Sequence, residues 1–284
     1  MNKLNIGIIG LGYVGKACKE VFSSFFNVLS YDINNSGSEA SIKDLVNKSD
    51  ILFLCLPTPM NKDGSCNISI IENVLSEVSG YKDSICVIKS TITPGSSDFF
   101  EKKFNNLKIF FNPEFLTEAN FINDFKTQDR IIIGSSDDMG AIYYSKIVDI
   151  YTEAFPGVKI IKLSLKEAEL VKYFTNSFLA LKVSYANEFF RLCKKLDIDY
   201  YSVLDVATLD KRIGKSHFTV PGPDGKFGFG GACFPKDLNA IIDVFKKNGL
   251  DPHLLEAAWK RNISEDRPEK DWEKLVGRAV VEDE

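Results

Sequence analysis

A glycine-rich stretch around Cys233 carries residue types that could do covalent chemistry. Residues 228–237 are Gly-Phe-Gly-Gly-Ala-Cys-Phe-Pro-Lys-Asp, and the glycines let the backbone approach a ligand that side chains would exclude. Because Pro235 suits the first turn of a helix, we expect a helix over 236–248, with Cys233 just ahead of its N-terminus and Lys236 close by. A helix N-terminus and a nearby lysine both favour the thiolate, which is the nucleophilic form of cysteine.

The alternative for Cys233 is a buried structural cysteine, which is the usual state of a free cysteine. The glycines that precede Cys233, and the Pro-Lys-Asp sequence that follows Phe234, are unusual surroundings for a core position. The local sequence therefore favours a functional thiol.

A second glycine-rich turn lies near the N-terminus. Residues 4–9 form a short apolar run, residues 10–15 are Gly-Leu-Gly-Tyr-Val-Gly, and a helical pattern follows over 16–25. A second strand-like run over 28–31 ends in Asp32. This order of strand, glycine turn, helix, strand and acid is typical of a dinucleotide-binding site.

Each residue of this turn has a physical task in such a site. Gly10 makes the tight turn, Gly12 lets the backbone reach the pyrophosphate, and Gly15 lets helix and strand pack closely. The helix that follows the turn offers its N-terminal N–H groups to the phosphates. Asp32 would bond the ribose 2′-hydroxyl and repel a 2′-phosphate, so the sequence predicts NAD rather than NADP. The alternative is a glycine-rich turn without a ligand.

The first half of the chain continues to alternate between strands and helices. Expected strands cover 51–56, 85–88, 108–111 and 130–134, and expected helices cover 68–78 and 97–104. Such repeats predict a Rossmann-type, doubly wound, mostly parallel α/β sheet, in which ligands bind at the carboxyl ends of the strands. The polar residues expected there are Thr58, Thr91, Glu114 and Glu118. For each threonine, ordinary turn chemistry is the alternative.

The second half is expected to be helical. Residues 165–195 contain neither Gly nor Pro and are apolar nearly all round, so this long helix must be covered on most sides and predicts a subunit interface. Lys172 and Asn176 share one of its faces; a solvated polar stripe is the alternative for them. Further helices are expected over 200–209 and 252–262. The charged residues 265–284, with Trp272 among them, indicate a loosely attached tail.

Composition excludes several classes of function. A chain of 284 residues has room for about two domains, and its net charge of −4 gives no support for nucleic-acid binding. No signal-peptide layout is present, and no apolar run approaches the ~20 residues of a membrane helix. The six cysteines form no CxxC pair, which favours reduced thiols and a cytoplasmic location. With two histidines, both remote from any cysteine cluster, we expect no metal site.

Taken together, these motifs resemble the UDP-glucose/GDP-mannose dehydrogenase family, and its UDP-glucose 6-dehydrogenases in particular. The resemblance runs from residue 6 to about 262 and is most specific in the Cys-Phe-Pro-Lys-Asp sequence. The matching segments are Gly10-Leu11-Gly12-Tyr13-Val14-Gly15, Cys55-Leu56-Pro57-Thr58-Pro59, Ser90-Thr91-Ile92-Thr93-Pro94-Gly95, Asn112-Pro113-Glu114-Phe115-Leu116-Thr117-Glu118, Lys172-Tyr173-Phe174-Thr175-Asn176, Arg212-Ile213-Gly214 and the Cys233 stretch.

The resemblance implies an enzyme of nucleotide-sugar metabolism, which oxidises UDP-glucose to UDP-glucuronate with NAD and supplies polysaccharide biosynthesis. Cys233 would capture the intermediate aldehyde as a thiohemiacetal, which is oxidised to a thioester and hydrolysed. Lys172 and Asn176 would stabilise the oxyanion, and Asp237 with Thr91 would relay a proton. Glu118 would help deprotonate the hydrolytic water.

The resemblance also implies the binding sites and the domains. A homodimer is implied, with Arg212 reaching the sugar of the neighbouring subunit, and Glu114 acts as a support. The expected domains are an NAD-binding domain over 1–163, a helical central domain over 164–264 and the tail over 265–284. Cofactor contacts are implied for Gly10, Gly12, Tyr13, Val14, Gly15, Asp32, Thr58, Thr91, Glu118 and Lys236. Substrate contacts are implied for Glu114, Phe115, Leu116, Lys172, Asn176, Arg212, Phe229 and Gly230.

The sequence departs from the family pattern in two places. Thr117 stands where the family usually has an arginine, and the sequence ends at Glu284 without the family's usual third domain, which helps to hold UDP. We therefore expect weaker selectivity for the nucleotide. Two alternatives stay open: a dehydrogenase of another nucleotide sugar, such as a UDP-N-acetylhexosamine or GDP-mannose, and a non-catalytic protein that binds nucleotide sugars. A mere binder would have no need of the Cys233 thiol.

Overall fold

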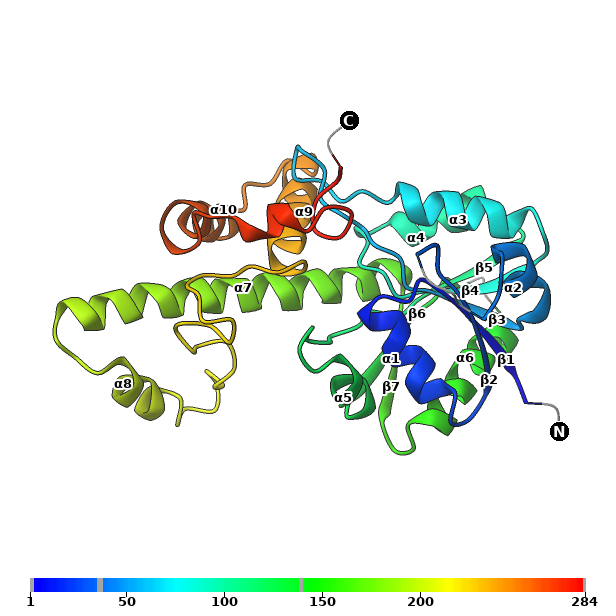
Figure 1. The fold of residues 1–284 in the computed structure, drawn as a ribbon, viewed down its shortest axis with the longest axis horizontal. Helices are drawn as coiled ribbons and strands as arrows, with labels where there is room; N and C mark the ends of the chain where they lie inside the picture. Colours follow the sequence, from blue (N-terminus) through cyan, green and yellow to red (C-terminus); the bar gives the residue numbers. More distant parts are fainter. Residues whose placement is uncertain (1–2, 35–37, 138–139, 283–284) are drawn as a thin grey trace. The chain divides into compact units, whose positions relative to one another are not determined.

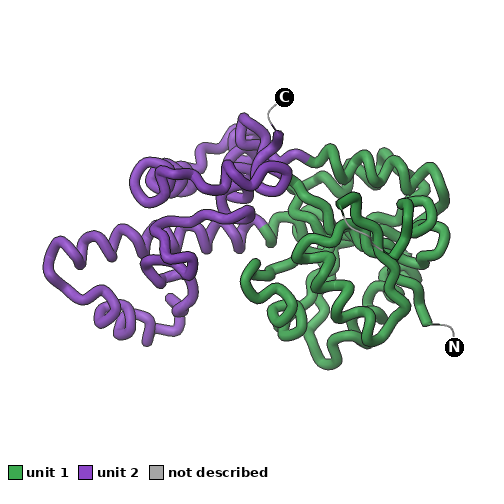
Figure 2. Tube along the Cα trace, in the orientation of Figure 1, with its two compact units in different colours: residues 1–58, 68–172 green, residues 59–67, 173–284 purple. Residues whose placement is uncertain are grey.

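The computed structural model describes residues 3–34, 38–137 and 140–282 (Figure 1). It divides into two compact units, 1–58 with 68–172 and 59–67 with 173–284 (Figure 2). The first unit thus extends beyond the expected boundary at 163, because the first turns of the long helix pack on its core through Leu165 and Ala168. The ends of the expected domains at 1–2 and 283–284 lie outside the described residues.

The first unit is built on a sheet of seven strands with the order β2-β1-β3-β4-β5-β6-β7. Neighbouring strands are parallel, except that β6 runs antiparallel to β5. This arrangement confirms the doubly wound, Rossmann-type sheet predicted from the sequence. The strands are β1 (Asn5–Ile9), β2 (Asn27–Tyr31), β3 (Ile51–Leu54), β4 (Ser84–Ile88), β5 (Leu107–Phe111), β6 (Arg130–Gly134) and β7 (Lys159–Leu163).

Helices cover both faces of this sheet (Figure 1). One face packs against α1, α5 and α6, and the other packs against α2, α3, α4 and the start of α7. Alternate residues of each strand therefore enter different cores, as in β6, where Ile131 and Ile133 face one core and Ile132 the other. The helices are α1 (Tyr13–Phe22), α2 (Ile42–Lys48), α3 (Ser69–Ser79), α4 (Ser96–Lys103), α5 (Phe121–Lys126), α6 (Ala141–Ala154) and α7 (Leu165–Lys195).

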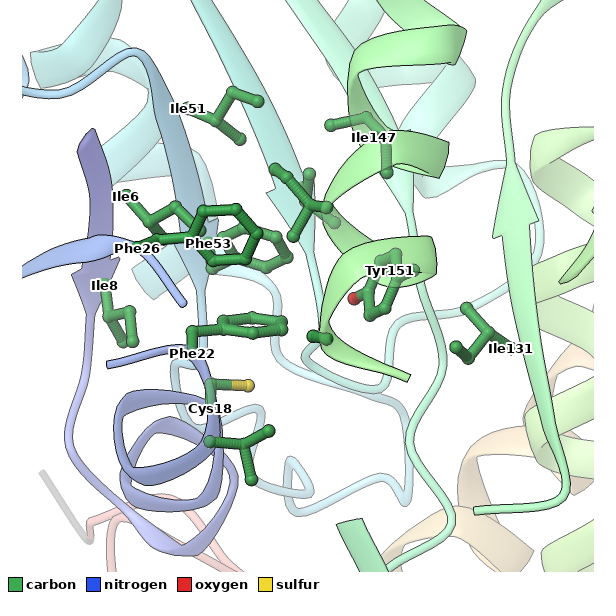
Figure 3. Packing of buried hydrophobic residues seen from close by; sticks show 14 of the residues in the cluster. Ile6, Ile8, Cys18, Phe22, Phe26, Ile51, Phe53, Ile131, Ile147 and Tyr151 are labelled. Atoms are coloured by element: carbon green, nitrogen blue, oxygen red, sulfur yellow. The ribbon is translucent and has the colours of Figure 1, made fainter. Parts of the chain in front are cut away.

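Aromatic side chains pack among isoleucines in the core on the α1 face (Figure 3). The ring of Phe22 on α1 lies 5.3 Å from that of Phe53 on β3 and 5.9 Å from that of Tyr151 on α6, measured between centroids. All three side chains are fully buried, and each such burial stabilises the fold by about 1.5–3 kcal/mol. The core thus fixes α1, and with it the glycine turn that opens this helix.

Helix α7 begins where a capping box places it. The Ser164 hydroxyl accepts a hydrogen bond from the Glu167 N–H at 3.3 Å, while the Glu167 carboxylate accepts one from the Ser164 N–H at 2.9 Å. Such reciprocal bonds satisfy N–H groups that a helix end leaves unpaired. The helix covers Leu165–Lys195, which are the bounds that the sequence predicts.

The second unit contains the rest of α7 and shorter helices. Phe229 packs with Ala180 of α7 and with Leu238 and Ile242 of α9. The helices are α8 (Tyr200–Ala207), α9 (Phe234–Lys247) and α10 (His253–Arg261), followed by a π-helical turn η2 (Asn262–Asp266) and a 3₁₀ turn η3 (Asp271–Lys274). Within the described ranges, no helix is both long enough and apolar enough to cross a membrane.

The expectation of a loosely attached tail over 265–284 is wrong for its described residues. Trp272 is 1% exposed and lies 5.4 Å from the ring of Trp259. The Met60 N–H donates to the Ala279 carbonyl at 2.9 Å, and the Val281 N–H donates to the Met60 carbonyl at 3.0 Å. The segment is thereby anchored to the loop 59–67, which belongs to the same unit.

Candidate active site

The glycine turn after β1 has the geometry of a dinucleotide cradle. Gly10 has φ of 92°, and a Cβ added there would lie 2.4 Å from the Cys55 carbonyl oxygen. A Cβ at Gly15 would lie 1.9 Å from the Gly10 carbonyl oxygen, whereas one at Gly12 would meet nothing within 4 Å. Packing therefore requires glycine at 10 and 15. At Gly12 the packing of the chain leaves room for a Cβ, and the open space beside Gly12 fits close approach by a pyrophosphate.

Asp32 lies beside this turn. Its carboxylate accepts hydrogen bonds from the Leu11 N–H at 2.6 Å and the Asn34 N–H at 2.9 Å. The turn joins β1 to α1, and the strand order reverses between β1 and β3, which is where doubly wound sheets bind nucleotides. Tyr13 and Val14 begin α1, and no side chain in the described part of the chain caps this helix. Its N-terminus suits a phosphate.

The turns after β3 and β4 are joined by side chains. The Thr58 hydroxyl donates to the Thr91 carbonyl at 2.7 Å, and the Leu56 N–H donates to the Ser90 hydroxyl at 2.8 Å. Thr58 and Thr91 are both buried. Thr58, predicted to contact the cofactor, therefore also has the structural role that was its alternative. The bonds hold two of the turns at the carboxyl edge of the sheet.

A buried ion pair joins the turn after β5 to α7. Lys172, which is 3% exposed, donates to the Glu114 carboxylate at 3.0 Å and to the Glu114 carbonyl at 2.6 Å. The other carboxylate oxygen accepts from the Leu116 N–H at 2.7 Å. Burial alone would raise the pKa of Glu114, but the Lys172 charge and the Leu116 N–H outweigh it and hold that pKa below its ordinary value. The Lys172 ammonium also lies 5.5 Å from the Phe115 ring centroid.

Glu114, predicted to be a support, is thus the carboxylate next to Lys172. Glu118, to which the sequence assigned the hydrolytic proton, lies exposed in the turn before α5. Beside it, Thr117 stands where the family usually has an arginine, and its N–H and hydroxyl both donate to the Asp124 carboxylate. Thr117 therefore fastens the turn to α5.

Cys233 is the N-cap residue of α9, with Pro235 in the first turn of that helix. Asp237, one turn further on, is 1% exposed. One of its carboxylate oxygens accepts a hydrogen bond from the Lys236 ammonium, and the other accepts one from the Asn176 amide at 2.6 Å. The structure therefore brings Asn176, Lys236 and Asp237 into one hydrogen-bonded cluster, and Cys233 lies at the start of the helix that carries Lys236 and Asp237.

The positive charge of Lys236 lies among negatively charged groups in this cluster. Burial would lower the pKa of Lys236, but the negative charge of Asp237 and the other negative charges nearby together outweigh burial and raise that pKa. The thiolate forms of Cys233 and Cys66 act on Lys236 in the same direction. A lysine that keeps its proton favours a neighbouring thiolate, so the cluster suits Cys233 as a nucleophile.

The remaining predicted residues lie in the second unit. Phe229 is 3% exposed, and its ring lies 6.5 Å from that of Phe234, the neighbour of Cys233. Gly230 follows Phe229 in the same glycine stretch. Arg212 is 88% exposed at its side chain and pairs with Asp210, with 2.6 Å between Nη2 and Oδ2.

Sequence reasoning missed several buried polar residues. Lys89, directly after β4, donates a hydrogen bond to the side-chain oxygen of Asn112. The same oxygen accepts a hydrogen bond from the Tyr151 hydroxyl. A lysine at the end of an apolar strand run was a signal for it. Asn262 bonds the Phe229 backbone in the glycine stretch, and Arg267 bonds the Phe227 carbonyl just before it. Nothing local in the sequence marks either residue.

Comparison with known proteins finds two domains of one family in this chain. Residues 35–155 match the NAD binding domain of the UDP-glucose/GDP-mannose dehydrogenase family, and residues 166–264 match its central domain. The first match begins after the glycine turn and Asp32. The second contains the whole cluster around Cys233. Together with the cradle after β1, the first match identifies NAD as the cofactor.

Individual relatives agree with these matches. The chain is 32% identical to the UDP-glucose 6-dehydrogenase AglM of Haloferax volcanii, over 94% of this chain and 71% of that protein. It is 36% identical to the UDP-glucose 6-dehydrogenase of Rickettsia bellii, of which it spans 49%. A solved UDP-glucose dehydrogenase from Pyrobaculum islandicum superposes with a TM-score of 0.83 at 30% identity, over 92% of this chain and 68% of that one.

Proposed function

The chain belongs to the UDP-glucose/GDP-mannose dehydrogenase family, and we propose that it oxidises UDP-glucose to UDP-glucuronate with NAD. The observation that carries this proposal is Cys233 at the N-terminus of α9, beside a buried cluster of Lys236, Asp237 and Asn176. Relatives that carry the name UDP-glucose 6-dehydrogenase support the substrate. The glycine turn and Asp32 support the cofactor.

The first oxidation takes the C6 alcohol to an aldehyde. NAD⁺, when bound, would supply the hydride acceptor for both oxidation steps. The alcohol proton leaves through Asp237 and Thr91, for which a carboxylate held by Lys236 and Asn176 is a suitable acceptor. Asp32 and the N-terminus of α1 would hold the cofactor's ribose and pyrophosphate.

Covalent capture then keeps the aldehyde on the enzyme. The Cys233 thiolate adds to C6, which forms a carbon–sulfur bond and moves an electron pair onto the C6 oxygen. Lys172 and Asn176, which are four residues apart on α7 and so share a face, stabilise this oxyanion. Loss of the second hydride gives a thioester. Water then adds to that carbon, the carbon–sulfur bond breaks, and the thiol returns to Cys233.

Hydrolysis of the thioester needs a group that takes a proton from water. We assign this role to Glu118, with Glu114 holding Lys172 in place. Summed over all steps, one alcohol, one water and two NAD⁺ give one carboxylate, two NADH and three protons. This balance distinguishes the mechanism from a simple alcohol dehydrogenase.

The yield of NADH tests the proposal. With limiting UDP-glucose and excess NAD⁺, we expect two NADH per sugar and no aldehyde that a hydrazine reagent can trap. One NADH per sugar with trapped aldehyde would exclude the thioester path. The same assay with GDP-mannose and UDP-N-acetylglucosamine tests the other dehydrogenases of the family. Binding of UDP-glucose without NADH would indicate a non-catalytic binder.

We further propose that two copies of the chain associate along α7. Large apolar side chains stay exposed on this helix at spacings of three, four and seven residues, which places them on one side. They are Phe174, Phe178, Tyr185, Phe189 and Leu192, and Leu196 continues the stripe directly after the helix. A second copy would cover this apolar stripe, and by resemblance its Arg212 would reach the neighbouring site. The six free cysteines favour the cytoplasm as the location.

A further inference from the structure

The backbone before Cys233 is held by an amide from the turn η2. Asn262 is fully buried; its side-chain oxygen accepts from the Phe229 N–H at 2.9 Å, and its side-chain nitrogen donates to the Phe229 carbonyl at 2.9 Å. A Cβ added at Gly228 would lie 2.3 Å from the same side-chain oxygen. One amide therefore satisfies both backbone polar groups of Phe229, and it needs glycine beside it.

Arg267 supports the next residue of this stretch. It is 2% exposed, and a Cβ added at Gly230 would lie 2.6 Å from its guanidinium carbon. Its guanidinium nitrogens donate to both oxygens of Asp271 at 3.0 Å. Asp224 and the Phe227 carbonyl accept further hydrogen bonds from it. The planar guanidinium is thereby fixed flat against the backbone of Gly230.

Movement of this stretch would reach the candidate catalytic thiol. Phe229 packs on Leu238 and Ile242 of α9, the helix that Cys233 caps. An unpaired buried backbone group is costly, so loss of the Asn262 amide would drive the Phe229 backbone toward water. The residues that set the backbone of 228–230 therefore also affect how Phe229 packs on α9.

We propose that Asn262 and Arg267 are positioning residues. They hold the backbone of residues 228–230 in place, so that the substrate binds this backbone with its reacting carbon next to the Cys233 thiol. This inference rests on the proposed function, in which Phe229 and Gly230 contact the substrate. It makes the segment 262–271 part of the catalytic apparatus, although the sequence indicated a loose tail for most of it.

Steady-state kinetics of the full chain test the proposal. For Asn262→Ala we expect the KM for UDP-glucose to rise about tenfold or more, with the KM for NAD⁺ unchanged. Arg267→Lys keeps the charge but loses the planar fork, and should raise the same KM. Alkylation of Cys233 by iodoacetamide, followed by mass spectrometry, should change its rate constant in both variants.

Asn262→Asp should restore substrate binding only at a pH where the new carboxyl group is protonated. A neutral carboxylic acid can accept from the Phe229 N–H and donate to the Phe229 carbonyl, as the amide does, whereas a carboxylate can only accept. We therefore expect the KM for UDP-glucose of this variant to be near that of the unmutated enzyme at pH 6 and well above it at pH 8.5. A purely structural role would not produce this pH dependence.

Arg191→Ala is the matched control. Arg191 binds Asp266 and the Glu265 carbonyl of the same turn, so its loss loosens η2 and leaves the bonds to Phe229 in place. If Asn262→Ala and Arg267→Lys only reduced the folded fraction, with KM and alkylation rate unchanged as in the control, the proposal would be wrong. If the unmutated protein did not reduce NAD⁺, the proposed function would fail, and the alkylation rates would still decide the positioning role.

Discussion

Cys233 is the residue on which the proposed chemistry depends. We expect Cys233→Ser to reduce NADH production by several orders of magnitude, because a serine hydroxyl is scarcely ionised at neutral pH and an ester is hydrolysed less readily than a thioester. Binding of NAD⁺ and UDP-glucose, measured by calorimetry, should persist, since the glycine turn and Asp32 are unchanged. Turnover at a near-normal rate would show that the thiol is structural.

Asp32 sets the choice of cofactor in the same way. Its carboxylate lies at the N-terminus of α1, fixed by the N–H groups of Leu11 and Asn34, and it would repel a 2′-phosphate. We expect the unmutated enzyme to prefer NAD⁺ strongly, and Asp32→Ala to lower that preference about tenfold or more by the loss of one charge-assisted bond and one repulsion. The measurement is the ratio of kcat/KM for NAD⁺ and NADP⁺. Equal use of both by the unmutated enzyme would contradict the assigned role.

Some features of the candidate site could be predicted because their signals are local. The glycines at 10, 12 and 15 stand within one turn, and Cys233 stands beside the Pro-Lys-Asp sequence that begins α9. Pairing between distant positions has no such signal: Lys172 meets Glu114 across 58 residues, and Asn176 meets Asp237 across 61. Only the fold brings these side chains together.

The helices and strands were likewise predictable where their signals are local. Helix α7 has its predicted bounds, because a capping box starts it and no Gly or Pro interrupts it. Strand β7 was missed: Lys159 and Lys162 are exposed, and its side chains are otherwise half-buried, so it lacks a continuous apolar run. The short helices α2 and α5 were missed as well. The residues after η2 were taken for a tail, since their pairing with the loop around Met60 is long-range.

Helix α4 depends on a titrating residue of α7. The carboxylate of Glu169 accepts from the N–H groups of Gly95 at 2.6 Å and Ser97 at 2.8 Å, at the start of α4. Burial raises the pKa of Glu169 to about 7, although these hydrogen bonds act in the opposite direction. The native state thus holds this proton at a pH where the unfolded chain has released it.

A raised pKa in the native state fixes the sign of the pH effect. The contribution of Glu169 to stability is fully present below its ordinary pKa of 4.5 and is lost as the pH rises through about 7. We expect the free energy of unfolding in urea to fall between pH 5 and 8, by at most about 3 kcal/mol. Glu169→Gln does not titrate and should flatten this slope. An equal slope in both proteins would show that Glu169 does not titrate in this range.

At the scale of the whole molecule, the apolar stripe on α7 predicts how copies of the chain associate. Phe174 is 73% exposed and Phe178 is 55% exposed, and burying each such side chain contributes about 1.5–3 kcal/mol. We expect light scattering at micromolar concentration to give twice the mass of one chain. Phe178→Asp would place an unpaired charge in the interface, which is costly, and should give the mass of one chain.

Leu254→Asp is the control for this prediction, because Leu254 is 75% exposed on α10 and lies outside the stripe. This variant should keep both the dimer and the activity. If Arg212 reaches the sugar in the neighbouring subunit, the Phe178→Asp monomer should fold, keep its affinity for NAD⁺ and lose most of its turnover of UDP-glucose. An unmutated protein that is monomeric and fully active would contradict both the dimer and the role of Arg212. A dimeric Phe178→Asp variant would place the interface elsewhere on the chain.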